Sequence, residues 1–315
     1  MKNTLINKKL KTAITLLFYA VMAIFIGWYV VKLDFSKLAS VHINWWFMAA
    51  AVPVSILSRV FLPSIWVQLI KMYEEVRGHY AYWQLNYIYA KSWLGRYIPG
   101  KVAWVGGKIY FAMGMGIGKT TLGVTALVEA ALQLLTALLI GVAFLFVSGA
   151  YSNFSVWYNI FFLFATVVGL IAVSPPVFNF MLKKAYKLLK KRPLDAKYTI
   201  KLPDLVKVAL EYTFVNALSG LPIYFLVKAA GFDIGIVELL YISGAFIFAG
   251  AIGTLAIFAP SGLGVREGVI MLFLVKILPA EISLAVVVLL RVWSVLLDVV
   301  YWLLSYVVSR FVKST

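Results

Sequence analysis

The chain contains no cysteine and only two histidines among its 315 residues. Without cysteine, the sequence cannot form disulfides, thiolate nucleophiles, zinc–thiolate sites or iron–sulfur clusters. His42 and His79 are both expected in connecting loops between apolar runs. The apolar part therefore has no histidine that could bind a metal or form a serine–histidine catalytic pair. We expect no metal, no cofactor and no catalytic residue.

Charged residues are also scarce. They make up 13% of the chain, against about 25% in soluble domains, while 63% of the residues are hydrophobic and the mean hydropathy is +0.95. This composition excludes a water-soluble fold. Because one membrane-spanning helix needs about 20 apolar residues, the length leaves room for roughly six to ten helices. We predict an all-α, polytopic transmembrane helix bundle that forms a single integral membrane domain over residues 1–315.

Acidic residues are the scarcest charged type, with 12 Asp and Glu against 29 Lys and Arg and a net charge of +17. The basic residues cluster beside hydrophobic runs, so they indicate membrane topology and not nucleic-acid binding. The segment Lys183–Lys201 has eight basic residues and the single acid Asp195. By the positive-inside rule this segment and both termini are cytoplasmic, in the inner or plasma membrane.

Long apolar runs predict the spans. The first follows a basic amino-terminal segment and lacks a small-residue cleavage site, which favours a transmembrane helix over a signal peptide. The amphipathic segment Pro176–Arg192 predicts a helix on the surface of the inner leaflet, with a merely topology-setting charged loop as the alternative. The predicted spans are about Ala13–Val31, Trp45–Ile70, Thr120–Val147, Val156–Val173, Leu205–Val227 and Ile282–Val308.

Two further stretches, at about 81–118 and 237–278, share one pattern: an apolar helix, a Pro/Gly break and a second apolar helix. Proline ends a helix and glycine lets the chain reverse, so each stretch predicts a re-entrant hairpin. The flanking charges place the ends of the first hairpin on the cytoplasmic side and those of the second on the outer side. Both tips should then point inward from opposite faces.

This arrangement predicts an inverted repeat with halves at about 45–175 and 204–310, linked by the basic cytoplasmic segment 176–203. Alternating-access transporters have such repeats, and their site lies near the midplane at the broken helices. The alternative is two pairs of ordinary short spans in an unrelated bundle.

Ionisable residues within the apolar runs are the candidate site, because each costs about 2.5–3.5 kcal/mol at the centre of an inserting helix. Lys101 and Arg266 begin the helices after the breaks, where free backbone N–H groups favour an anion such as phosphate. Arg291 and Asp298 share one helix face, as do Lys101 and Lys108. For any single residue, an ion pair between helices is the alternative. The predicted substrate-binding residues are Arg96, Pro99, Gly100, Lys101, Lys108, Glu129, Pro260, Gly262, Gly264, Arg266, Glu267, Arg291 and Asp298.

Four of these features together resemble the membrane-domain family of lysylphosphatidylglycerol synthases, the flippase-like part. They are Arg96-x-x-Pro99-Gly100, the span containing Glu129, Pro260-x-Gly262-x-Gly264-x-Arg266-Glu267, and Arg291. Lys101 stands where a second glycine is expected. The resemblance implies movement of a phospholipid or another lipid-linked anionic headgroup between leaflets, with Arg96, Glu129, Glu267 and Arg291 in the site.

The same resemblance bears on enzyme activity. The synthases carry a soluble aminoacyl-transferase domain after the membrane part, whereas this chain stops soon after its last predicted span. We therefore expect a stand-alone member without lipid aminoacylation.

The predicted function is a lipid translocase for an anionic lipid. One alternative is a secondary transporter or channel for a small solute, which would lack a cavity that opens sideways to lipid. The other is a non-transporting scaffold for a lipid-modifying enzyme or glycosyltransferase. Anionic membrane lipids are the expected partners, and a second copy of the chain or an enzyme of lipid synthesis are further candidates.

Overall fold

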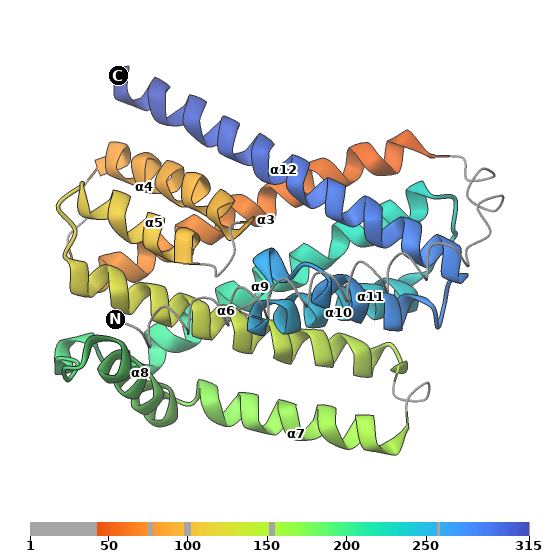
Figure 1. Ribbon diagram of the computed structural model, residues 1–315, viewed down its shortest axis with the longest axis horizontal. Coiled ribbons are helices and arrows are strands. Elements are labelled where there is room, and N and C mark those ends of the chain that lie inside the picture. The colour runs from red at the N-terminus through yellow and green to blue at the C-terminus, as the bar shows by residue number, and fades with distance from the viewer. Residues whose placement is uncertain (1–42, 75–77, 98–101, 151–154, 257–258, 315) are drawn as a thin grey trace, which may run out of the picture.

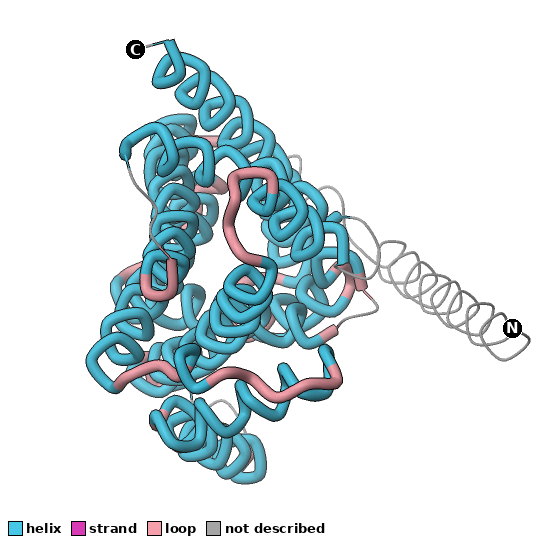
Figure 2. Tube along the Cα trace, turned by 90° about the vertical axis from the view of Figure 1, so that its left-hand side faces the viewer, coloured by secondary structure: helices cyan, strands magenta, loops and turns pink. Residues whose placement is uncertain are grey.

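The computed structural model describes residues 43–74, 78–97, 102–150, 155–256 and 259–314, and Figure 1 shows them as a bundle of helices. Figure 2, turned by 90°, shows helices joined by loops, with no strand in this part of the chain. The all-α fold is therefore confirmed. The first predicted span, Ala13–Val31, and the break residues Pro99, Gly100 and Lys101 lie outside the described residues.

Five helices are long and apolar enough to cross a membrane. Four of them confirm predicted spans, and the fifth, α10, was predicted as an arm of the second hairpin. They are α3 (Trp45–Lys71), α6 (Lys119–Val147), α9 (Leu202–Ala229), α10 (Ile236–Leu255) and α12 (Ala280–Ser314).

A sixth candidate crossing involves α7 (Val156–Val173), which has the predicted bounds and is followed by the amphipathic α8 (Pro175–Lys190). Together the two form a candidate span that is bent by 82°. The two helices are separated only by Ser174, whose extended backbone (φ −64°, ψ 137°) is suited to the residue before a proline. The chain is thus a multi-pass membrane protein.

The helix ends gather at two opposite ends of the bundle. At one end, the backbone N–H of Asn44 donates to the carbonyl of Ala229 at 2.8 Å, which joins the start of α3 to the end of α9. At the other end, the carboxylate of Glu74 accepts from the N–H of Gly118 at 2.9 Å, at the start of α6. Arg192 of the basic segment donates to Thr120 there at 3.2 Å. The basic segment thus lies at the end of the bundle where α3 ends and α6 begins; which side of the membrane this end faces stays a prediction.

Each predicted hairpin corresponds to two helices that pack against each other, and their re-entrance into the membrane stays a prediction. The first consists of α4 (Gly78–Trp93), the 3₁₀ turn η1 (Leu94–Tyr97) and α5 (Val102–Met113). The second consists of α10, η4 (Pro260–Gly262) and α11 (Val265–Leu274). The two breaks meet, because η1 contacts η4.

The hairpins differ in length. Helix α10 has 20 residues and is about 30 Å long, which is enough to cross the bilayer, whereas α4, α5 and α11 have 16, 12 and 10 residues. The inverted repeat stays a prediction. The loop position of His79 is wrong, because α4 begins at Gly78 and includes it.

Backbone conformation explains the residues of the second break. Ser261, Gly262 and Gly264 have φ angles of 52°, 69° and 83°, in the left-handed region that favours glycine. A side chain at 262 would also meet the Cα of Gly253 in α10 at 2.9 Å. The carboxylate of Glu267 then accepts from the N–H of Gly264 at 2.7 Å and caps α11.

Candidate functional site

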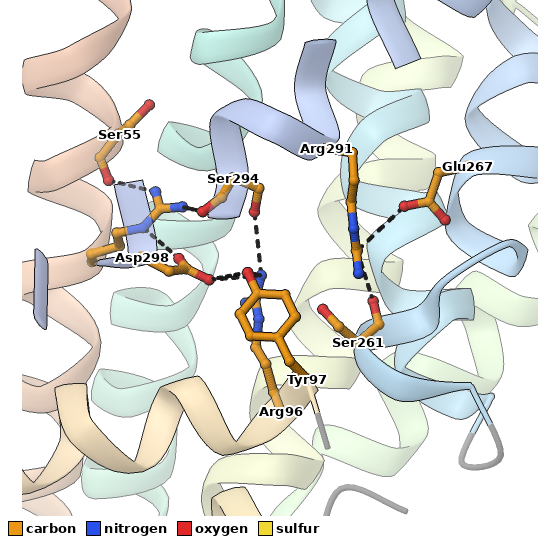
Figure 3. A network of polar contacts seen from close by, with 9 residues as sticks. Ser55, Arg96, Tyr97, Ser261, Glu267, Arg291, Ser294 and Asp298 are labelled. Atoms are coloured by element: carbon orange, nitrogen blue, oxygen red, sulfur yellow. Dashed lines mark hydrogen bonds and ion pairs between the residues drawn. The ribbon is translucent and has the colours of Figure 1, made fainter. Parts of the chain in front are cut away.

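Helix α12 connects both breaks through one face. Arg291, Ser294 and Asp298 lie three and seven residues apart, a spacing that places them on the same side of an α-helix. Figure 3 shows Ser294 and Asp298 directed toward Arg96 and Tyr97 of η1, and Arg291 directed toward Ser261 and Glu267 of the second hairpin. The predicted common face of Arg291 and Asp298 is therefore confirmed, and it is the place where the two breaks attach.

Asp298 is the centre of the first group. Its side chain is fully buried, and its Oδ1 accepts from Nε of Arg59 on α3 at 2.8 Å. Its Oδ2 accepts from the hydroxyl of Tyr97 at 2.6 Å and lies 3.1 Å from Nη2 of Arg96. One carboxylate thus serves two guanidinium groups. Such a buried carboxylate is retained only where cations and donors surround it.

Other donors of these arginines bind serine and backbone oxygens, although Nε of Arg96 has no partner among the described residues. Arg96 Nη2 donates to the hydroxyl of Ser294 at 3.2 Å, and Arg59 donates to the carbonyls of Ser55 and Ser294 at 2.9 and 3.2 Å. The Arg96 guanidinium also stacks over Trp93, 4.6 Å from the ring centroid. These contacts hold the two arginines in fixed orientations.

Arg291 forms the second group with the break of the other hairpin. Its Nη1 donates to Glu267 Oε1 at 3.3 Å and to the Ser261 carbonyl at 3.5 Å. Since the other oxygen of Glu267 caps α11, this single carboxylate joins the α11 start to α12.

A cavity of about 230 Å³ lies beside these groups. Three arginines, Arg59, Arg96 and Arg266, contribute to its wall, whereas none of the described lining residues is a carboxylate. The wall also contains polar side chains and three tryptophans. Among these other lining residues are Ser58, Gln133, Asn216, Trp93, Trp104 and Trp293.

Arg266 differs from the other two arginines of the wall. Its guanidinium packs over the ring of Phe246 at 4.3 Å. Ion pairs near the cavity join Arg59 and Arg96 to Asp298 and Arg291 to Glu267, and no ion pair among the described residues includes Arg266. The cavity wall therefore carries a cation without a carboxylate partner in this part of the chain.

Several donors near the cavity are buried without a partner among the described residues. They are Nε of Arg96 and the indole Nε1 atoms of Trp93 and Trp104. These groups donate hydrogen bonds and cannot accept them. Each buried donor without an acceptor costs about 1–3 kcal/mol. The site thus has an excess of donors as well as of positive charge.

Lys108 and Glu129 lie apart from the cavity wall. They form an ion pair in which both side chains are almost completely buried, and the hydroxyl of Tyr89 donates to the other Glu129 oxygen at 2.8 Å. The Lys108 ammonium lies 5.0, 4.9 and 5.4 Å from the ring centroids of Trp66, Tyr89 and Trp104. Trp104 lines the cavity and also contacts this pair.

The predicted site residues therefore fall into three sets. Arg96, Arg266, Glu267, Arg291 and Asp298 come together around the cavity and α12, with the break residues Pro260, Gly262 and Gly264 beside them. Lys108 and Glu129 form their own pair, and Pro99, Gly100 and Lys101 lie outside the described residues.

Three members of the site are absent from the predicted set: Arg59, Tyr97 and Ser294. Arg59 has a signal in the sequence, because it is a charge within an apolar run. Ser294 lies on the face defined by Arg291 and Asp298. Among the described residues, no three His, Asp or Glu side chains come together as a metal site would require.

Residues 12–301 match the family described as lysylphosphatidylglycerol synthase TM region. No curated protein matches the chain.

Proposed function

Because the chain belongs to the family of the lysylphosphatidylglycerol synthase TM region, we propose that it is a lipid translocase of the plasma or inner membrane. Its substrate would be an anionic phospholipid or a lipid-linked phosphate, whose headgroup passes between leaflets through the cavity. The observation that carries this proposal is the arginine-lined cavity in which Arg266 has no carboxylate partner among the described residues. Transport without chemical change of the lipid is part of the same proposal.

Charge is the first support. Four guanidinium groups, those of Arg59, Arg96, Arg266 and Arg291, accompany two carboxylates, those of Asp298 and Glu267. Unbalanced charge inside a membrane bundle is costly, so the site favours an anion that restores the balance. A cationic headgroup would add to the imbalance.

The kind of cation is the second support. Arginine presents a planar fork that binds two oxygens of a phosphate, whereas lysine offers a point charge. The unpartnered donors of Arg96, Trp93 and Trp104 would also gain acceptors from a phosphate, after rotation of their side chains. A phosphate offers several acceptor oxygens that share a negative charge, whereas a neutral hydroxyl offers one uncharged oxygen.

Cavity size and the two breaks are the third support. At about 230 Å³ the cavity is smaller than the roughly 300–1,000 Å³ of sites for drug-sized ligands. It suits a headgroup whose acyl chains remain in the bilayer. Broken helices that meet beside such a site are the arrangement found in alternating-access transporters.

The test is leaflet exchange in proteoliposomes that hold the purified protein. Fluorescent phosphatidylglycerol and phosphatidylcholine with equal chains are compared by bleaching the outer leaflet, and phosphate trapped in the vesicles reports leakage of a small anion. We expect fast exchange of the anionic lipid, slower exchange of the zwitterionic lipid and no phosphate release.

Arg266→Lys is the informative variant, because it keeps the charge and removes the fork. We expect anionic exchange to fall about tenfold, which corresponds to about 1.4 kcal/mol. Arg310→Lys is the matched control near the end of α12 and should exchange lipid like the parent protein. Phosphate release without lipid exchange would instead identify a solute transporter. Absence of both, with intact protein in the vesicles, would favour a scaffold.

A further inference from the structure

Helix α8 lies across one end of the bundle. The axis of α8 is bent by 82° from the axis of α7, the apolar helix before it. Helix α8 packs against α6 and α7 at the end where Glu74 and Arg192 contact the start of α6. With α7 in the membrane, α8 therefore runs nearly parallel to the bilayer plane at the level where the spans end.

One stripe of α8 fixes it to the protein. Phe178, Leu182 and Tyr186 are four residues apart and are all buried, with exposures of 2%, 5% and 2%. Asn179 adds two hydrogen bonds to the backbone of Ile200: its Nδ2 donates to the carbonyl and its Oδ1 accepts from the N–H, both at 2.9 Å. The orientation of the helix about its own axis is thus set by packing and by a paired polar contact.

The opposite side of α8 has two different strips. Phe180, Met181 and Leu188 form an apolar strip with exposures of 64%, 41% and 74%. Four exposed lysines border it and form a basic strip, and one of them, Lys184, lies between Phe180 and Leu188, 5.9 Å from the ring of Phe180. These lysines are Lys183, Lys184, Lys187 and Lys190.

We propose that this outward side of α8 is a binding surface for the anionic lipids of the adjoining leaflet. The apolar strip enters the boundary between headgroups and acyl chains, and the basic strip binds lipid phosphates. Exposed apolar residues next to lysines on one helix are the pattern of interfacial helices. Lys191 and Arg192 extend the basic strip, and Asp195 is the only acid between residues 176 and 203.

Charge complementarity selects the occupant. Each basic residue close to an anionic surface strengthens binding about fivefold, so the four lysines of the basic strip strongly favour anionic over zwitterionic lipid. An acidic protein partner would form ion pairs with the lysines, but it would not account for the exposed apolar side chains of Phe180 and Leu188 at the depth of the bilayer surface. This proposal concerns a surface outside the cavity and holds whether or not the protein moves lipid.

The first measurement locates α8 in the bilayer. Because the chain has no cysteine, Leu188→Cys gives a single labelling site on the full-length protein. In nanodiscs that contain 30 mol% phosphatidylglycerol, a fluorophore at 188 should be quenched by a nitroxide attached near the lipid headgroup. The matched label, Lys197→Cys on the exposed segment after α8, should keep most of its fluorescence. An unquenched label at 188 would overturn the proposal.

The second measurement tests lipid selectivity. Spin-labelled phosphatidylglycerol and phosphatidylcholine report the immobilised lipid around the protein. Replacing Lys183, Lys184, Lys187 and Lys190 by Gln should lower the preference for the anionic lipid at least threefold.

The control removes the same charge elsewhere, by Gln at the exposed Lys119, Lys197, Lys201 and Lys207, and should lower the preference less. The melting temperature should stay unchanged in both sets, because all eight side chains are exposed. An equal loss in both sets would assign the effect to net charge and would contradict a surface on α8.

Discussion

Two ionic groups a short distance apart differ in their balance of charge. In the Lys108–Glu129 pair, one cation meets one carboxylate, both are almost completely buried, and aromatic rings surround the ammonium. In the cavity network, four guanidinium groups accompany two carboxylates, and Arg266 has no carboxylate partner among the described residues. The charges of the pair balance each other without a ligand, whereas those of the network do not.

The difference shows why burial of charge alone does not identify a binding site. A buried, fully paired charge is consistent with a fixed contact between α5 and α6, whereas an excess of donors and cations beside a cavity calls for an anion. The two groups touch through Trp104, which contacts the Lys108 ammonium and also lines the cavity. Substitutions can separate their roles.

The largest effect is expected from Glu129→Gln. It leaves the Lys108 ammonium buried without its counter-charge, and breaking a buried pair in this way costs about 3–5 kcal/mol of stability. The double variant Lys108→Met with Glu129→Gln removes both charges and should recover most of that loss. Thermal unfolding in detergent measures both. If the double variant is as unstable as the single one, the pair stabilises the protein through more than the mutual neutralisation of its charges.

The same double variant also tests the assignment of Glu129 to the substrate site. If it is stable and exchanges lipid like the parent protein, the pair is structural. If it is stable but inactive, Glu129 belongs to the transport machinery as the family resemblance implies.

The next largest effect concerns the network. Arg96→Ala and Glu267→Gln should each abolish measurable lipid exchange, a fall of about 100-fold for the loss of roughly 3 kcal/mol in charged hydrogen bonds. Membrane insertion should be intact, because each change removes a charge that is costly in lipid. Exchange in proteoliposomes and the amount of protein in the membrane fraction are measured together. Wild-type exchange rates in both variants would place the site elsewhere.

A smaller effect of opposite sign is expected from Asp298→Asn. The change releases Arg59 and Arg96 from their shared carboxylate, so the excess of positive charge at the cavity increases. Anionic lipid should then bind about tenfold more tightly, which is about 1.4 kcal/mol, and leave more slowly. Competition by phosphatidylglycerol against phosphatidylcholine of equal chain length measures this. Weaker anion binding would mean that Asp298 positions the arginines and does not compete with the headgroup.

The smallest effect is expected from exposed positions that report topology. Lys190→Cys and Lys276→Cys lie at opposite ends of the bundle and should leave stability and exchange unchanged. An impermeant thiol reagent should label position 276 from outside and position 190 only after the cells are opened. Ready labelling of position 190 in intact cells would reverse the proposed orientation.

Sequence reasoning located the helices well, because continuous apolar runs and breaker residues are local signals. The run at Val156–Val173 has the bounds of α7, and the residues from Pro260 to Gly264 mark the second break through their left-handed conformations. Spacing along one helix was equally informative, since Arg291 and Asp298 do share a face.

Partners from different helices could not be predicted in the same way. Arg59 and Asp298 are 239 residues apart in the chain, and nothing local relates them. Lys108 and Glu129 were assigned to one substrate site because both are charged and lie in apolar runs, but only three-dimensional packing shows that they pair with each other.

The attachment of both breaks to α12 has a mechanical consequence. Arg291 and Asp298 are seven residues apart, about 10.5 Å along the helix axis, and the contacts of η1 and η4 lie within that length. A rotation of α12 about its own axis would pull on both breaks at once. A crosslink that immobilises α12 near Ser294 would therefore restrain η1 and η4 together.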